Sequence, residues 1–151
     1  MKRHPALHDL ARDHHHALVH SLNIKRAETA EQLREAAVAL VKLWNDDLIF
    51  HFREEEEVLL PVISRHGSPT DNADIRRMLD DHAYLRDGLR RLEKAIVSGQ
   101  DLADLVRDLG QRLESHARLE DRTIFGWIES LLTDIELDEL AGLSAEFRRK
   151  V

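Results

Sequence analysis

Apolar residues recur at intervals of three and four along most of this chain, which is the period of an amphipathic α-helix. The pattern predicts four long helices over about residues 6–26, 29–61, 71–99 and 101–131, and a short fifth helix within residues 133–149. Only six glycines and three prolines are available for turns among 151 residues, and no segment alternates as a strand does. We therefore expect an all-α fold.

Short connections force consecutive helices to be neighbours, so the simplest arrangement is an up-down-up-down antiparallel four-helix bundle with the short C-terminal fifth helix as an appendage. The chain length suits a single domain over residues 1–151, with the bundle over about 6–132 and the appendage over 133–151. The second helix, about 50 Å long at 1.5 Å per residue, either overhangs the bundle or breaks near Asn45 and Asp46.

Local signals mark several helix ends. Thr29 and Thr133 are each followed three residues later by Gln or Glu, as in a capping box. Asp71 is suited to cap the third helix, and Gly99 to end it. The inward stripe of the fourth helix is expected to continue through Thr123 and Trp127.

Composition excludes several classes of protein. With 22 Lys and Arg against 29 Asp and Glu, the formal charge is −7, so nucleic acid and anionic lipid should be repelled. The absence of cysteine excludes disulfides, thiolate zinc sites and iron–sulfur clusters. No signal-peptide pattern or membrane span is recognisable. We expect a cytoplasmic protein with neither a nucleic-acid nor a membrane partner; a protein partner is not indicated.

Histidine and glutamate fill the gaps in two of the apolar stripes. His51 is followed by Glu55 in the second helix, and His116 by Glu120 in the fourth. A spacing of four residues places imidazole and carboxylate on one helical face, one turn apart. A metal ion could contact both side chains of either pair.

The other two long helices each place a histidine in the apolar stripe. His82 lies within that of the third helix, and His14 near the middle of that of the first. His15 lies at the margin of the same stripe and is the alternative ligand. Any one such histidine is more simply explained as a hydrogen-bonded core residue, whereas the set favours ligands.

Carboxylates among leucines are costly to bury without a partner, and a bound cation removes this cost. Four imidazoles and two carboxylates are too many for one tetrahedral zinc ion but suit two cations bridged by the carboxylates. Nitrogen and oxygen donors without sulfur favour two iron ions, with manganese or zinc as alternatives. Glu54, Glu56 and Glu57 fall outside the core stripe and are expected to be solvated, although Glu56 or Asp121 could orient a ligand.

The segments HFREEEEVLL and HARLEDRTIF begin at His51 and His116, 65 residues apart. Both contain His, Glu at the fourth following position, an acid at the fifth, and an apolar pair at the eighth and ninth. The two halves of the chain therefore look pseudo-symmetric, which strengthens the prediction of a metal site.

The chain resembles the hemerythrin-like, or HHE cation-binding, family over about residues 7–131. Its matching segments are Asp13-His14-His15, His51-Phe52 with Glu55, Glu56, Leu59 and Pro61, Asp81-His82, and His116 with Glu120, Asp121, Ile124 and Phe125. The resemblance implies a four-helix bundle holding a non-haem, carboxylate-bridged di-iron centre. Members of the family carry or sense dioxygen, sense iron, or respond to nitric oxide and to damaged iron centres.

One departure from the oxygen carriers concerns the third helix. The carriers have a second histidine four residues after the first, where this chain has Arg86. The pattern looks closer to the iron-sensing and iron-centre-repair members, which makes reversible oxygen carriage less favoured. With one imidazole fewer, a coordination position would be open, and we expect Arg86 to offer a charge-assisted hydrogen bond to whatever binds there.

The preferred hypothesis is a binding protein that binds or senses oxygen, nitric oxide or iron, rather than an enzyme. One alternative is a di-iron enzyme that oxidises ferrous iron, consumes peroxide or repairs iron centres, although repair would be helped by cysteine, which the chain lacks. The other alternative is a metal-free helical interaction module in which the core His and Glu residues satisfy one another.

Overall fold

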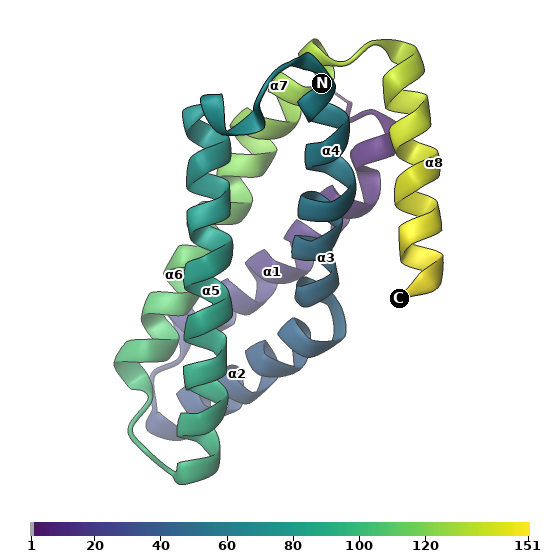
Figure 1. The fold of residues 1–151 in the computed structure, drawn as a ribbon. Coiled ribbons are helices and arrows are strands. Elements are labelled where there is room, and N and C mark those ends of the chain that lie inside the picture. Colours follow the sequence, from purple (N-terminus) through teal and green to yellow (C-terminus); the bar gives the residue numbers. More distant parts are fainter. Residues whose placement is uncertain (1) are drawn as a thin grey trace.

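The computed structural model describes residues 2–151, and nearly all of this range is helical (Figure 1). Within it no strand occurs, which confirms the all-α prediction. The longer helices are α1 (His8–Arg26), α2 (Ala30–Leu43), α5 (Ala73–Ser98), α6 (Ala103–Leu119) and α8 (Asp134–Lys150). The shorter α-helices are α3 (Ile49–Glu54), α4 (Leu60–Ile63) and α7 (Phe125–Leu131), and the short 3₁₀ turns are η1 (Pro5–Leu7), η4 (Ser64–His66) and η5 (Pro69–Asp71).

Three short π-helical segments interrupt the long helices. They are η2 (Trp44–Leu48), η3 (Glu55–Leu59) and η6 (Glu120–Ile124). A π segment inserts an extra residue into a turn, which redirects the helix and shifts the face that later residues present. At η2 this gives the break expected near Asn45 and Asp46, and α2 and α3 point in different directions (Figure 1).

The shift in register at η6 corrects one prediction. Thr123 is exposed and Trp127 only half-buried, whereas Ile124 and Ile128 are fully buried. A regular period of 3.6 residues places Thr123 and Trp127 on the inward face. The extra residue of the π segment moves this face on by one position, to Ile124 and Ile128.

The helix ends follow the capping rules closely. Thr29 and Thr133 each form a complete capping box, as predicted. Asn72 caps α5 by accepting hydrogen bonds from two backbone amides, and the predicted cap Asp71 lies in η5 instead. Gly99 ends α5 in the left-handed conformation, with φ of 71°, which glycine adopts without strain.

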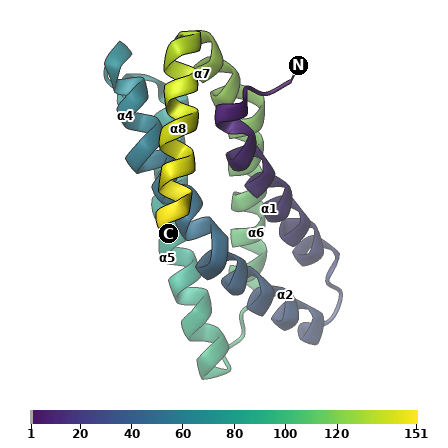
Figure 2. The ribbon, with the colours of Figure 1, turned by 90° about the vertical axis from the view of Figure 1, so that its right-hand side faces the viewer.

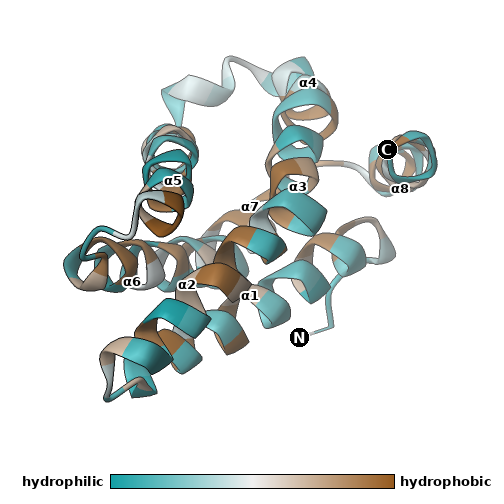
Figure 3. Ribbon diagram, turned by 90° about the horizontal axis from the view of Figure 1, so that it is seen from below, coloured by the Kyte–Doolittle hydropathy of each residue, from teal (hydrophilic) through white to brown (hydrophobic). Residues whose placement is uncertain are grey.

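Amphipathic helices enclose two hydrophobic clusters. α1 contacts α2 and α6, and α5 contacts the same two helices. The labelled helices carry both hydrophobic and hydrophilic residues (Figure 3). One cluster includes Ala17, Leu48, Leu85 and Leu113, and the other includes Leu10, Leu59, Met78 and Ile124.

In three of the helical segments, the chain passes from one cluster to the other at a histidine: His14, His82 and His116. His14, for example, lies between Leu10 of one cluster and Ala17 of the other, and His82 between Met78 and Leu85. A polar layer therefore separates two apolar ones in the interior.

Helix α8 has 17 residues and occupies the range predicted for the C-terminal helix. It contacts η1 and η3, and it lies alongside the rest of the molecule (Figures 1 and 2). Leu137, Leu140 and Ser144 are buried in this contact. Among residues 2–151, no helix combines the length and apolarity that crossing a membrane requires.

Candidate metal centre

Six polar side chains converge in the layer between the two hydrophobic clusters, each at most 2% exposed. They are His14, His51, Glu55, His82, His116 and Glu120. They come from α1, α3, η3, α5, α6 and η6. The structure thus brings together all six residues of the preferred ligand set.

The six residues form two groups that share both glutamates. His14 and His51 with Glu55 and Glu120 make one group, and the same two glutamates with His82 and His116 make the other. In each group, one ligand atom per residue lies within 4.8 Å of the others. Each group combines the nitrogen and oxygen donors that metal ions take in proteins and is compatible with metal binding.

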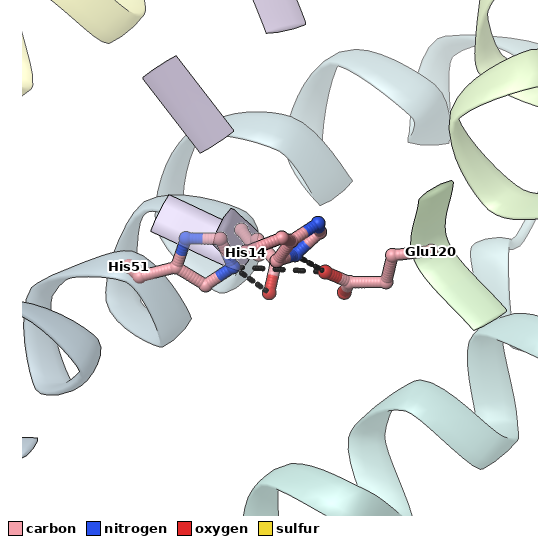
Figure 4. A group of neighbouring side chains, drawn as sticks. His14, His51 and Glu120 are labelled. Carbon is pink, nitrogen blue, oxygen red and sulfur yellow. Dashed lines mark hydrogen bonds and ion pairs between the residues drawn. The ribbon is translucent and has the colours of Figure 1, made fainter. Parts of the chain in front are cut away.

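Glu120 lies between both groups. Its Oε1 atom is 2.6 Å from Nε2 of His14 and 3.6 Å from Nε2 of His51, and these three side chains point toward one another (Figure 4). Its other oxygen, Oε2, is 3.5 Å from Nε2 of His116. The two oxygens of one carboxylate therefore face different groups.

Glu55 is the residue equivalent to Glu120 in the segment that begins at His51. Its Oε1 atom is 3.0 Å from Nε2 of His82 and 3.4 Å from Nε2 of His51. The four histidines thus all direct Nε2 toward the shared carboxylates. Nε2 is therefore the atom with which each ring could bind a metal ion.

Each of the four histidines donates its Nδ1–H to a further carboxylate. The pairs are His14 with Asp121 at 2.7 Å, His51 with Asp13 at 2.8 Å, His82 with Glu56 at 2.6 Å, and His116 with Asp81 at 3.2 Å. Such hydrogen bonds fix the tautomer and orientation of a ligating ring and increase its basicity. Asp13 and Asp81 had no predicted role.

Arginines neutralise three of these outer carboxylates. Arg148 of α8 donates to Asp13 and Arg112 to Asp81. Arg86 donates from both terminal nitrogens to Glu56, at 2.9 Å each. Both terminal nitrogens of Arg86 thus bind Glu56, and among the described residues no hydrogen bond joins Arg86 to the six-residue cluster.

Several polar atoms in the cluster are buried without a hydrogen-bond partner. These atoms are Nε2 of His51, Nε2 of His116, Oε2 of Glu55 and Oε2 of Glu120. An unsatisfied buried polar atom costs about 1–3 kcal/mol, and more when the group is charged. Two nitrogens and two oxygens that face one another without partners fit a bound cation.

The electrostatics of the protein side chains also favour a positive charge at this position. Burial lowers the pKa of His14, but hydrogen bonds to Asp121 and Glu120 outweigh it and raise the pKa to about 9. For His82, burial is likewise outweighed by Glu55 and Glu56, and its pKa is raised to about 9. In the absence of metal these rings hold protons that a cation would replace.

Two predictions about neighbouring residues need correction. His15 is exposed and lies outside the cluster, because His14 takes the inward position of that turn. Glu54, expected to be solvated, is 1% exposed and accepts a hydrogen bond from Arg148. The second finding depends on α8, whose packing the pattern of the second helix cannot reveal.

The family model of the hemerythrin HHE cation-binding domain matches residues 6–128 of this chain. The chain belongs to this family. It matches none of the curated proteins and none of the solved structures with which it was compared.

In the hemerythrin domain, the two similar segments that begin at His51 and His116 make equivalent contacts. Glu55 and Glu120 each begin a π segment, and the acid that follows each reaches a histidine of the opposite half: Glu56 binds His82, and Asp121 binds His14. A buried His/Glu cluster in a cation-binding family is compatible with metal binding.

Proposed function

We propose that this hemerythrin domain binds two iron ions in its interior. His14 and His51 would hold one ion, His82 and His116 the other, and Glu55 and Glu120 would bridge them. The observation that carries this proposal is the sharing of two buried glutamates by two histidine pairs. Manganese and zinc are the alternatives by donor type.

The donor count supports binding of a further small molecule. Each ion would receive two imidazole nitrogens and one oxygen from each bridging glutamate, hence four donors from the protein. Non-haem iron sites with few protein ligands keep positions open for water or a substrate. When bound, iron supplies reversible redox chemistry and these open positions.

Aromatic rings pack against the histidines of the cluster and leave room only for a small ligand. Phe52 stacks on the ring of His82 with centroids 4.0 Å apart, and Phe125 on that of His14 at 5.3 Å. Both phenylalanine rings are fully buried and give the site an apolar wall. We infer that the domain binds or senses dioxygen, nitric oxide or iron, within the up-down-up-down four-helix bundle of the family.

The test is elemental analysis of the protein as isolated, combined with its near-ultraviolet and visible spectrum. We expect about two irons per chain, with ligand-to-iron charge-transfer bands that change when nitric oxide or dioxygen is added. About one zinc and no such bands would overturn the proposal. Sustained turnover of peroxide or ferrous iron would instead make the protein an enzyme.

A further inference from the structure

A cavity of about 210 Å³ lies between the last turns of α8 and the segments η2 and α3. One member of the proposed metal centre, His51, is in its wall. Four carboxylates also line it: those of Asp13, Glu54, Asp46 and Asp47. The cavity therefore connects an acidic part of the surface with the edge of the centre.

Arg148 is the arginine in the wall of this cavity, and His51 is the other basic side chain there. Its Nε donates to Oε1 of Glu54 at 2.6 Å, and its Nη2 donates to Oδ2 of Asp13 at 2.7 Å. One guanidinium therefore lies against two carboxylates, of which Asp13 also accepts a hydrogen bond from His51. With four acids against Arg148 and His51, acidic side chains outnumber basic ones in the cavity wall.

The carboxylate of Glu54 is only half satisfied. Its Oε1 binds Arg148, whereas Oε2 is buried without any hydrogen-bond partner. A buried carboxylate oxygen without a donor is costly. Such an oxygen is a ready ligand for a divalent cation, because hard cations prefer carboxylate oxygens.

Asp13 links this cavity to the centre. The same oxygen, Oδ2, accepts from Arg148 on the cavity side and from Nδ1 of His51 on the centre side. Glu54 directly precedes the proposed bridging residue Glu55 in the chain. A cation bound by Asp13 and Glu54 would therefore be one side chain away from the first ligand of the centre.

We propose that Asp13 and Glu54 form a transient divalent-cation site on the route by which metal reaches the centre, and that Arg148 holds this site until the cation displaces it. The site deepens the proposed function and depends on it. The last turn of α8 suits such a displacement, since after Ser144 all its residues are exposed or half-buried. Segments with little buried surface open locally at small cost.

The experiment follows the anaerobic uptake of Co²⁺ by metal-free full-length protein, using the visible absorption of the bound ion. For Glu54→Gln we expect uptake to be roughly tenfold slower than in the wild type, because an acidic guide site is lost, with the same final occupancy. For Arg148→Met we expect faster uptake. Glu57 is exposed and follows Glu54 by three positions in the chain, so Glu57→Gln is the matched control and should take up Co²⁺ at the wild-type rate.

A further variant changes an exposed residue of the cavity wall, so that its effect on uptake does not depend on altered folding. Asp47 is exposed at the cavity wall, so Asp47→Asn should fold normally, slow uptake modestly, and reduce its sensitivity to salt. Equal rates for all variants at full occupancy would overturn the route and leave the centre intact. Reduced final occupancy in Glu54→Gln would also overturn it. A wild-type protein that takes up no cobalt at equilibrium would overturn the centre itself.

Discussion

Asp13 accepts a hydrogen bond from Nδ1 of His51, 2.8 Å away on another helix, although its neighbour in the chain is His14. Asp81 repeats this relationship, since it precedes His82 and binds His116. An acid–histidine dipeptide therefore supplies a side chain that points into the cluster and a carboxylate that orients the histidine of the next helix. The four rings are held by contacts between helices, which prepares their geometry before metal binds.

The first prediction concerns these outer carboxylates. Asp81→Asn should weaken metal affinity roughly 10- to 100-fold, because a neutral amide fixes the His116 ring less firmly and makes it less basic. Affinity is measured by competition with a chromophoric chelator. Asp81 is a cleaner target than Asp13, which also lines the acidic cavity.

Asp80→Asn provides the control, because Asp80 is the adjacent residue and is exposed. It should bind metal as the wild type does. If both variants have the same affinity, the hydrogen bond from His116 to Asp81 does not influence the metal.

The second prediction separates shared from unshared ligands. Glu120 belongs to both groups and His82 to one. Glu120→Gln should therefore abolish binding of both ions, whereas His82→Asn should leave the group around His14 and His51 able to bind one. Metal content after gel filtration gives the stoichiometry, with Glu114→Gln in α6 as the control. Two ions retained in Glu120→Gln would contradict the bridging assignment.

The third prediction concerns stability. A ligand that binds only the folded state at 100 to 1,000 times its Kd adds about 3–4 kcal/mol. For a chain of this size, removal of metal by a chelator should lower Tm by roughly 10 °C. Readdition of metal should restore it. Identical melts with and without chelator would favour the metal-free interaction module.

Much of the fold could be predicted because helical period and capping are local properties. The capping boxes at Thr29 and Thr133 formed as expected, and His14 was preferred to His15 on phase alone. The inward positions of Thr123 and Trp127 were wrong, since a π segment leaves no reliable mark in the apolar pattern.

Of the four outer carboxylates, Glu56 and Asp121 could be proposed from sequence, whereas Asp13 and Asp81 could not. Asp13 and Asp81 contact histidines of other helices, and Glu54 is buried by Arg148 from 94 positions away. Such contacts depend on how helices are placed relative to one another. An acid directly before an inward histidine was the available signal, and its occurrence in both halves could have suggested a shared role.

The fourth prediction is a pH dependence of metal binding. In the metal-free protein His14 and His82 have a pKa of about 9, so at pH 7 both rings are protonated. Binding must displace these protons, so affinity should rise with pH from 7 and level off above about 9. Calorimetry with Mn²⁺ in buffers of different ionisation enthalpy counts the protons released. Release of no protons at pH 7 would show that metal does not displace protons from these two rings.

The last prediction tests the close approach of α5 and α6. A Cβ atom added at Gly88 would lie 2.2 Å from Cδ2 and 3.3 Å from Cγ of Leu109, which is completely buried. Gly88→Ala should therefore destabilise the fold by about 1–3 kcal/mol, although alanine is the better helix former. Gly126→Ala in α7 meets nothing within 4 Å and should stabilise it by up to about 1 kcal/mol. Urea unfolding of the metal-free variants measures both changes in stability. If Gly88→Ala also stabilised the fold, α5 and α6 would be farther apart than the structure places them.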